Sequence, residues 1–249
     1  MVGGQPERPQ GPDEETTHDV RDGCLAAPVV SEPRDLRTES AREQILRAAA
    51  RHFATLPYHL VSLDEILAEA KVTKGALYFH FKSKHALAVA IVDRYTELSR
   101  GIIEEQVRHQ RAALETLIDI SYQSAVQDIT QDTARAGVHL LEAIGRTDGL
   151  QAGRITAWTA ALRDIAGRAV DEGDIRAGID PADVSRLLVA VSTGLRQISP
   201  VADGATLLND IGNTWVLMLP GLVESTRLRY FTEFIRRRTR VAIAKINRC

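Results

Sequence analysis

The chain has 249 residues, of which 44% are hydrophobic and 5% aromatic, and its formal net charge is −2. This composition can build the sizeable core of one large or two small domains, and the scarcity of valine–isoleucine alternation favours packed helices over sheets. The two cysteines, Cys24 and Cys249, form no C-x-x-C pair, which excludes a disulfide framework or a zinc site and fits a reducing cytosol. No apolar run reaches the ~18 residues of a membrane span. The polar, acidic N-terminus is unlike a signal peptide, so we expect a cytoplasmic protein without a membrane partner.

Charge is distributed unevenly along the chain. Residues 1–33 hold two arginines against seven acids, a net charge of −5, whereas residues 34–84 hold nine lysines and arginines against six acids, a net charge of +3. Residues 85–249 hold twenty charged groups of each sign. A small basic segment beside a neutral body suits a DNA-binding protein better than the overall charge does.

Residues 1–37 combine five prolines, four glycines and eight acids with few aliphatic side chains. This composition is typical of segments that do not fold, so we expect a disordered acidic tail. Arg34 and Arg37 at its end suit two interpretations, a solvated linker or a basic arm that reaches a DNA minor groove. The linker is the simpler interpretation.

The first expected helix covers Ser40–Ala54. Its inner face is formed by residues that recur every four positions, Ile45, Ala49 and Phe53. The second helix starts after Ser62, which forms a capping box with Glu65. Its apolar residues fall at positions i, i+3, i+4 and i+7, namely Leu63, Ile66, Leu67 and Ala70.

A third short helix is expected after Thr73, a second N-cap candidate. The period of this helix places Val72, Ala76 and Phe79 toward the core. Two short helices joined by a tight turn have the form of a helix-turn-helix, whose second helix enters the major groove of DNA. The alternative is a two-helix hairpin with an aromatic core and solvated lysines.

The outward residues of this unit are the candidates for DNA contact. Recognition helices contact base edges mainly through their N-terminal residues, so Lys74 is placed to read a guanine. Gly75 lets the backbone approach DNA closely, and the side chain of Leu77 or Ala76 could touch a thymine methyl. Tyr78 and Lys84 carry groups that commonly bond phosphates. The full candidate set is Ser62, Thr73, Lys74, Gly75, Ala76, Leu77, Tyr78, His80 and Lys84.

The segment from Ser40 to Leu98 resembles the TetR family of bacterial repressors. The resemblance rests on AREQILRAAARHFA in the first helix, S-x-D-E-I at the second, VTKGALYFHF at the third and K-S-K-x-A-L at the fourth. The wording ALYFHFKSK is most like the γ-butyrolactone-receptor branch of actinobacteria. The chain departs from the family at Thr55–Tyr58, where the family usually has a glycine before an aromatic residue, so a different local turn is expected.

Helices are expected to follow one another to the end of the chain. The fourth helix starts after Ser83 and runs toward Val107, and later helices lie between glycine, proline and aspartate breakers, near 111–128, 132–146, 150–173, 181–198, 205–219 and 221–245. We therefore expect an all-α protein with three parts: the tail over 1–37, an N-terminal three-helix helix-turn-helix DNA-binding domain over 38–84 and a helical bundle over 85–249. The TetR resemblance implies that the bundle binds a ligand and forms a dimer.

No catalytic constellation is visible in the sequence. The chain has no phosphate-binding glycine loop, no H-E-x-x-H and no G-x-S-x-G motif. His139 and Glu142 have the spacing of a pair of metal ligands, but a single such pair is more often a hydrogen-bonded polar spot. We expect no enzyme activity, no metal and no cofactor.

The TetR resemblance implies a ligand cavity in the bundle, and the γ-butyrolactone-receptor branch has a tryptophan at a place comparable to Trp158. Pocket and core are both open interpretations of this tryptophan. Other expected lining residues are Tyr122, Val126, Leu141, Leu162, Val184, Leu188 and Val191. No charged residue is clearly directed inward in the sequence pattern, so the expected effector is a small, apolar and neutral molecule.

Two apolar helices, 181–198 and 205–219, predict a homodimer surface. They carry more apolar residues than one core needs, namely Val184, Leu187, Leu188, Val191, Leu195, Leu207, Leu208, Ile211, Trp215 and Leu219. The basic final helix suits packing on the body better than a membrane or nucleic-acid contact.

Together these features predict a transcriptional repressor. It would bind a near-palindromic, double-stranded DNA operator as a homodimer and would be released by a small apolar effector. Two alternatives stay open: a DNA-binding protein of the same kind that has no ligand and answers to a protein partner, and a helical-bundle enzyme that carries a borrowed DNA-binding unit.

Overall fold

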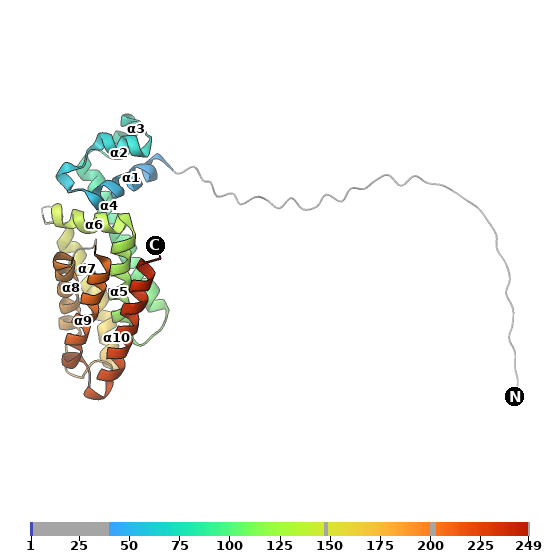
Figure 1. Ribbon diagram of the computed structural model, residues 1–249, viewed down its shortest axis with the longest axis vertical. Helices are drawn as coiled ribbons and strands as arrows, with labels where there is room; N and C mark the ends of the chain where they lie inside the picture. The colour runs from blue at the N-terminus through green and yellow to red at the C-terminus, as the bar shows by residue number, and fades with distance from the viewer. Residues whose placement is uncertain (2–39, 147–148, 200–202, 249) are drawn as a thin grey trace. The chain divides into compact units, whose positions relative to one another are not determined.

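A computed structural model of the chain describes Met1 and residues 40–146, 149–199 and 203–248. These residues form ten α-helices and one 3-10 turn, and none of them lies in a strand (Figure 1). The prediction of an all-α protein is confirmed. The expected tail over 1–37 lies outside the described residues, as do both cysteines.

The first four helices follow the order expected from the sequence. They are α1 (Ala41–Thr55), α2 (Leu63–Ala70), α3 (Lys74–His80) and the long α4 (Lys84–Arg108), with the 3-10 turn η1 (Tyr58–Leu60) before α2. Each helix begins at a hydroxyl that accepts a backbone hydrogen bond: Ser40, Ser62, Thr73 and Ser83. Ser62 bonds the N–H of Asp64 rather than that of Glu65. The inner residues predicted for α1 are all buried.

Two turns set the angles between these helices. Lys71 ends α2 in the left-handed conformation, with φ 54°, and this directs the chain toward the Thr73 cap. At the departure from the family pattern, Leu56 is extended with φ −118°, so no glycine is needed there. Tyr58 stacks on Phe53 with ring centroids 5.9 Å apart, which holds the turn against the core.

Six further helices form the rest of the described chain: α5 (Ala113–Thr130), α6 (Asp132–Ala143), α7 (Leu150–Asp171), α8 (Pro181–Ile198), α9 (Gly204–Leu222) and α10 (Ser225–Ile246). The break expected at Pro220 is wrong. The helix α9 passes through Pro220 because Leu222 and Val223 are buried beyond it, and proline near a helix end removes only one backbone bond. None of the described helices is both long and apolar enough to cross a membrane.

Buried side chains form two apolar clusters. One cluster is built from α5, α7, α8, α9 and α10. The other joins α1–α4 to α6, so α6 packs on both α1 and α4. Glycine makes this packing possible at one point: a Cβ on Gly137 would lie 2.5 Å from the Tyr95 side chain. The apolar packing therefore continues across the expected boundary between residues 84 and 85.

Candidate nucleic-acid interface and ligand pocket

In α3 the residues that face the core and those that face solvent differ from the predicted ones. Leu77 is fully buried, whereas Phe79 is 77% exposed, so the expectation that Leu77 faces outward and Phe79 inward is wrong. Phe81, just beyond the helix, is also buried, and the Leu77–Phe81 spacing of four residues sets the inner face. That spacing was the signal available in the sequence, and it identifies Phe79 as a surface residue that the sequence analysis missed.

The remaining outward residues of α3 lie where the sequence placed them. Lys74, Gly75 and His80 are exposed, and Tyr78 is 41% exposed. Ala76 is half-buried, and its N–H donates to the Thr73 hydroxyl at 3.2 Å. The start and one side of α3 thus present the Lys74 ammonium, the backbone at Gly75 and the rings of Tyr78 and His80 to solvent.

Lys84 has a structural role that the sequence did not predict. Its ammonium donates to the carbonyl oxygens of Val61 at 2.7 Å and His59 at 3.3 Å, and it lies 4.7 Å from the centroid of the Tyr58 ring. Burial lowers the pKa of this lysine. Because these contacts engage its ammonium, Lys84 clamps the turn before α2 onto the start of α4. A phosphate contact through a remaining N–H stays a prediction.

A second charged contact fixes α2 on α1. Glu69 of α2 forms an ion pair with Arg51 at 2.7 Å and lies 2.9 Å from the ring nitrogen of His52, both on α1. Lys74, in contrast, makes no hydrogen bond or ion pair with a residue of the described ranges. The lysine at the start of α3 is therefore available to an outside partner.

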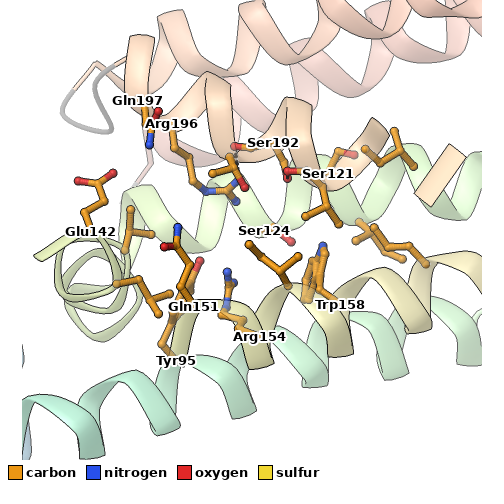
Figure 2. A pocket seen from close by; sticks show the side chains of 18 of the residues that line it. Tyr95, Ser121, Ser124, Glu142, Gln151, Arg154, Trp158, Ser192, Arg196 and Gln197 are labelled. Carbon is orange, nitrogen blue, oxygen red and sulfur yellow. Dashed lines mark hydrogen bonds between the residues drawn. The ribbon is translucent and has the colours of Figure 1, made fainter. Parts of the chain in front are cut away.

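A pocket lies in the bundle, walled by α5, α6, α7 and α8 and closed on one side by Tyr95 of α4 (Figure 2). Its volume is about 90 Å³. Four of the predicted lining residues are present: Leu141, Trp158, Leu162 and Leu188. The pocket interpretation of Trp158 therefore agrees with its position, and its ring is half-buried rather than fully enclosed.

Tyr122 and Val126 do not line this pocket, so that part of the prediction is wrong. The wall contributed by α5 consists of Leu117, Ile120, Ser121 and Ser124. Tyr122 points to the opposite side, where its hydroxyl bonds the Thr239 hydroxyl of α10 at 2.6 Å, and burial raises the pKa of Tyr122 to about 12. Val184 and Val191 are also absent from this lining.

The pocket is not neutral, which corrects a second expectation. Arg154 from α7 and Arg196 from α8 both enter it, and Glu142 of α6 lies at its edge (Figure 2). Each arginine continues a stripe of inward residues at four-residue spacing, the first with Trp158 and Leu162 and the second with Leu188 and Ser192. Those stripes were the sequence signal for both arginines.

Arg196 is paired inside the bundle. Its Nη2 lies 2.6 Å from the carboxylate of Asp128, which is almost fully buried, and its Nε donates to the same oxygen at 2.7 Å. Burial alone would lower the pKa of this guanidinium, but the charges of Asp128 and Tyr95 together raise it. Burial, followed by the Asp128 charge, raises the pKa of the Tyr95 hydroxyl.

The residues predicted for a dimer surface are mostly core residues. Eight of them are buried: Val184, Leu188, Leu195, Leu207, Leu208, Ile211, Trp215 and Leu219. Trp215 also donates its ring N–H to the Ser121 hydroxyl at 3.2 Å. The same two helices nevertheless expose other apolar side chains, with Leu187 at 42%, Ile198 at 76% and Leu217 at 81%.

Two further polar features have structural partners. The His139 ring lies 3.2 Å from the Phe53 carbonyl oxygen and so joins α6 to α1, and no group of three or more potential ligand side chains among the described residues is placed to hold a metal ion. Two arginines of α10 pair with acids of the body: Arg227 with Asp174, and Arg238 with buried Asp119, which Arg111 shares. The packing interpretation of this helix is confirmed.

Comparison with known proteins places these features among DNA-binding regulators. Residues 45–91 match the family described as bacterial regulatory proteins, tetR family. The chain is 32% identical over 187 residues to the A-factor receptor protein of Streptomyces griseus, in an alignment that covers 72% of this chain and 63% of that protein. The chain thus spans less than two thirds of the length of that relative.

Solved structures agree with this chain in fold, and they cover a larger share of it. A gamma-butyrolactone receptor described as ArpA-like superposes with a TM-score of 0.66 at 27% identity, covering 82% of this chain and 99% of that one. CprB from Streptomyces coelicolor, described as a TetR family protein in complex with its biological operator sequence, superposes with a TM-score of 0.67 at 30% identity, covering 81% and 98%.

Proposed function

The chain belongs to the TetR family of DNA-binding transcriptional regulators, and from that premise we propose that it is a repressor. It binds a near-palindromic operator as a homodimer, and a small molecule in the bundle pocket releases it. The observation that carries the proposal is the joint presence of an exposed α3 face and a pocket that reaches α4, the helix that follows α3.

The α3 face supplies the DNA contacts in this proposal. Lys74 stands at the start of the helix, where major-groove readers contact bases, and its ammonium is available. A Cβ on Gly75 would meet only the Thr73 hydroxyl oxygen, at 3.9 Å, so packing inside the chain does not require glycine here. This supports a close approach of DNA to the α3 backbone. Tyr78 and Phe79 then contact the sugar-phosphate backbone or a thymine methyl.

The exposed apolar residues of α8 and α9 supply the dimer surface. Leu187, Ile198 and Leu217 would otherwise stand in water, and half-buried Val191 and Met218 line a groove between the two helices. A two-fold interface uses the same patch on both subunits. It presents two α3 helices to successive major grooves, roughly 34–36 Å apart along the duplex.

The effector acts through the pocket. One relative is named a receptor for A-factor and one similar structure a gamma-butyrolactone receptor, which supports a small-molecule ligand. A cavity of about 90 Å³ is smaller than the ~300–1,000 Å³ of most ligand sites, so the ligand fits only when the walls move. A ligand that prefers the widened pocket shifts the population toward that conformation, in which the two α3 helices no longer match adjacent grooves.

Selection of bound fragments from random duplex DNA tests the proposal. The full-length chain should enrich one near-palindromic sequence at physiological salt, and Lys74→Ala should enrich it less while keeping its fold. If the full-length chain enriches no sequence, or if Lys74→Ala enriches the same sequence to the same degree, sequence-specific reading by α3 is contradicted.

A further inference from the structure

The two arginines in the pocket differ in how their charge is balanced. Arg196 is neutralised by Asp128 and also donates to the Ser192 carbonyl oxygen at 2.7 Å. With the residues that the structure describes, Arg154 makes a single hydrogen bond, from its Nη2 to the Ser99 hydroxyl at 3.3 Å. No carboxylate within the described ranges lies at ion-pair distance from Arg154. One guanidinium in the pocket is therefore uncompensated.

The position of Arg154 makes this charge costly. Its guanidinium lies 4.3 Å from the centroid of the Tyr95 ring and 5.5 Å from that of Trp158, and its Nε is buried without a hydrogen-bond partner. The two rings offset part of the cost through cation–π attraction. The buried Nε has no acceptor and has lost the water it had when unfolded, while the residue as a whole is half-buried.

The other acids near the pocket do not pair with Arg154. Asp128 is occupied by Arg196, and Glu142 is exposed at the edge of the pocket. The anion that would neutralise the charge of Arg154 must therefore come from outside the described chain.

The other residues that line the pocket indicate what else the bound molecule must contain. Trp158, Leu117, Leu162 and Leu188 present apolar surface beside the guanidinium. Figure 2 shows Arg154 and Trp158 rising from the same helix into the pocket. An occupant that satisfies both features has one acidic group and an apolar body.

We propose that the effector of this pocket is a small carboxylic acid with an apolar tail, whose carboxylate pairs with Arg154. The inference rests on the proposed function, because it specifies the ligand class of the same pocket. A carboxylate fits better than a phosphate dianion because a single guanidinium is unpaired, and its two oxygens match the parallel N–H groups of a guanidinium edge.

The same contact gives the ligand a route to the DNA-binding helices. A carboxylate on the Nε–Nη2 edge of Arg154 replaces the bond to Ser99, which lies on α4. The ligand thus withdraws a link between α7 and the helix that follows α3. The ion pair forms only in the conformation in which Arg154 has left Ser99, and this preference for one of two conformations is the differential interaction that a population shift requires.

A matched ligand series tests the inference. Octanoic acid, methyl octanoate and γ-octalactone share a similar apolar carbon content and differ in charge. Calorimetry on the full-length chain measures binding, and anisotropy of labelled operator measures release. We expect the acid to bind at least tenfold more tightly than the ester or the lactone. This preference should disappear in Arg154→Gln and persist in Arg163→Gln, which removes an exposed arginine of the same helix.

Each outcome separates the inference from the proposed function. Ester or lactone binding as tight as the acid, an acid preference that survives Arg154→Gln, or no acid binding at millimolar concentration overturns the inference. Release of operator by the lactone alone overturns the inference and leaves the proposed function intact. Acid binding through Arg154 without operator release confirms the carboxylate site, but it overturns the effector role that the inference assigns to the acid and the release step of the proposed function. A cooperative thermal melt and an unchanged far-UV circular dichroism spectrum of the ligand-free Arg154→Gln chain show that it remains folded.

Discussion

The Arg154 guanidinium lies 4.3 Å from the centroid of the Tyr95 ring, and the same tyrosine side chain packs on Gly137 of α6. Tyr95 therefore touches the pocket and α6 at once. Since His139 of the same helix lies beside the Phe53 carbonyl of α1, a continuous series of contacts joins the pocket to the DNA-binding helices. Packed side chains can therefore transmit a movement of the pocket wall to α3.

Gly137→Ala tests the tightness of this packing. The new methyl group would lie 2.5 Å from Tyr95, and overpacking of this kind costs ~1–3 kcal/mol. We expect the free energy of urea unfolding to fall by that amount. Gly153→Ala on α7 is the matched control, because nothing lies within 4 Å of a Cβ there and alanine is a better helix residue. Equal stability of the two variants would contradict the close contact.

Lys74→Ala tests base reading. The lysine stands at the start of α3 without a described partner, so its loss should weaken specific binding by ~1–3 kcal/mol and relax preference at one position. The measurement is anisotropy with the selected operator and its single-base variants. Lys82→Ala is the control: this exposed lysine follows α3, where an ammonium can bond phosphates, so its loss should weaken binding to all sequences alike. An unchanged preference profile for Lys74→Ala would remove its base-reading role.

Phe79→Ala and Leu77→Ala separate the DNA face of α3 from its core face. Phe79 is 77% exposed, so its truncation should leave the melting temperature nearly unchanged while lowering operator affinity. Leu77 is fully buried, and its truncation should cost ~2–5 kcal/mol of stability. Thermal melts with operator titrations check both. The opposite pattern, a stable Leu77→Ala and an unstable Phe79→Ala, would restore the helical phase expected from the sequence.

Lys84→Met tests the clamp between η1 and α4. Removal of the ammonium leaves the carbonyl oxygens of His59 and Val61 without this donor, and we expect a loss of ~1 kcal/mol in unfolding free energy. Lys82→Met should change stability less, because its ammonium bonds the Tyr78 carbonyl at an exposed site. If Lys84→Met unfolds at the same urea concentration as the unmodified chain, the clamp adds nothing to stability.

The sequence predicted what depends on local pattern. The caps Ser62, Thr73 and Ser83 and the inner stripe of α1 follow from neighbouring residues, and they define the helix-turn-helix before any tertiary contact is known. The phase of α3 does not follow in this way. A seven-residue helix holds less than two turns, and the burial of Phe81 outside it decides which side faces the core.

The pocket was less accessible to sequence reasoning. Leu141, Leu162 and Leu188 were predicted because apolar residues on amphipathic helices point inward, and Trp158 was predicted from the resemblance to the γ-butyrolactone-receptor branch. Arg154 and Arg196 were missed because an arginine in such a helix ordinarily faces water. Only the tertiary structure brings Arg196 to Asp128, which lies 68 residues earlier in the chain. Trp215 was likewise assigned to a surface because nothing local identifies Ser121 as its partner.

The stoichiometry of the protein on its selected operator tests the central claim most directly. Sedimentation equilibrium of the full-length chain with a labelled duplex should give two protomers per operator, and a duplex cut to one half-site should bind far more weakly. Leu217→Glu with Ile198→Glu, which places charges on the two most exposed apolar residues of α8 and α9, should abolish the two-protomer complex without unfolding the chain. A single protomer bound to the full operator, with equal affinity for the half-site, would contradict a homodimeric operator-binding repressor.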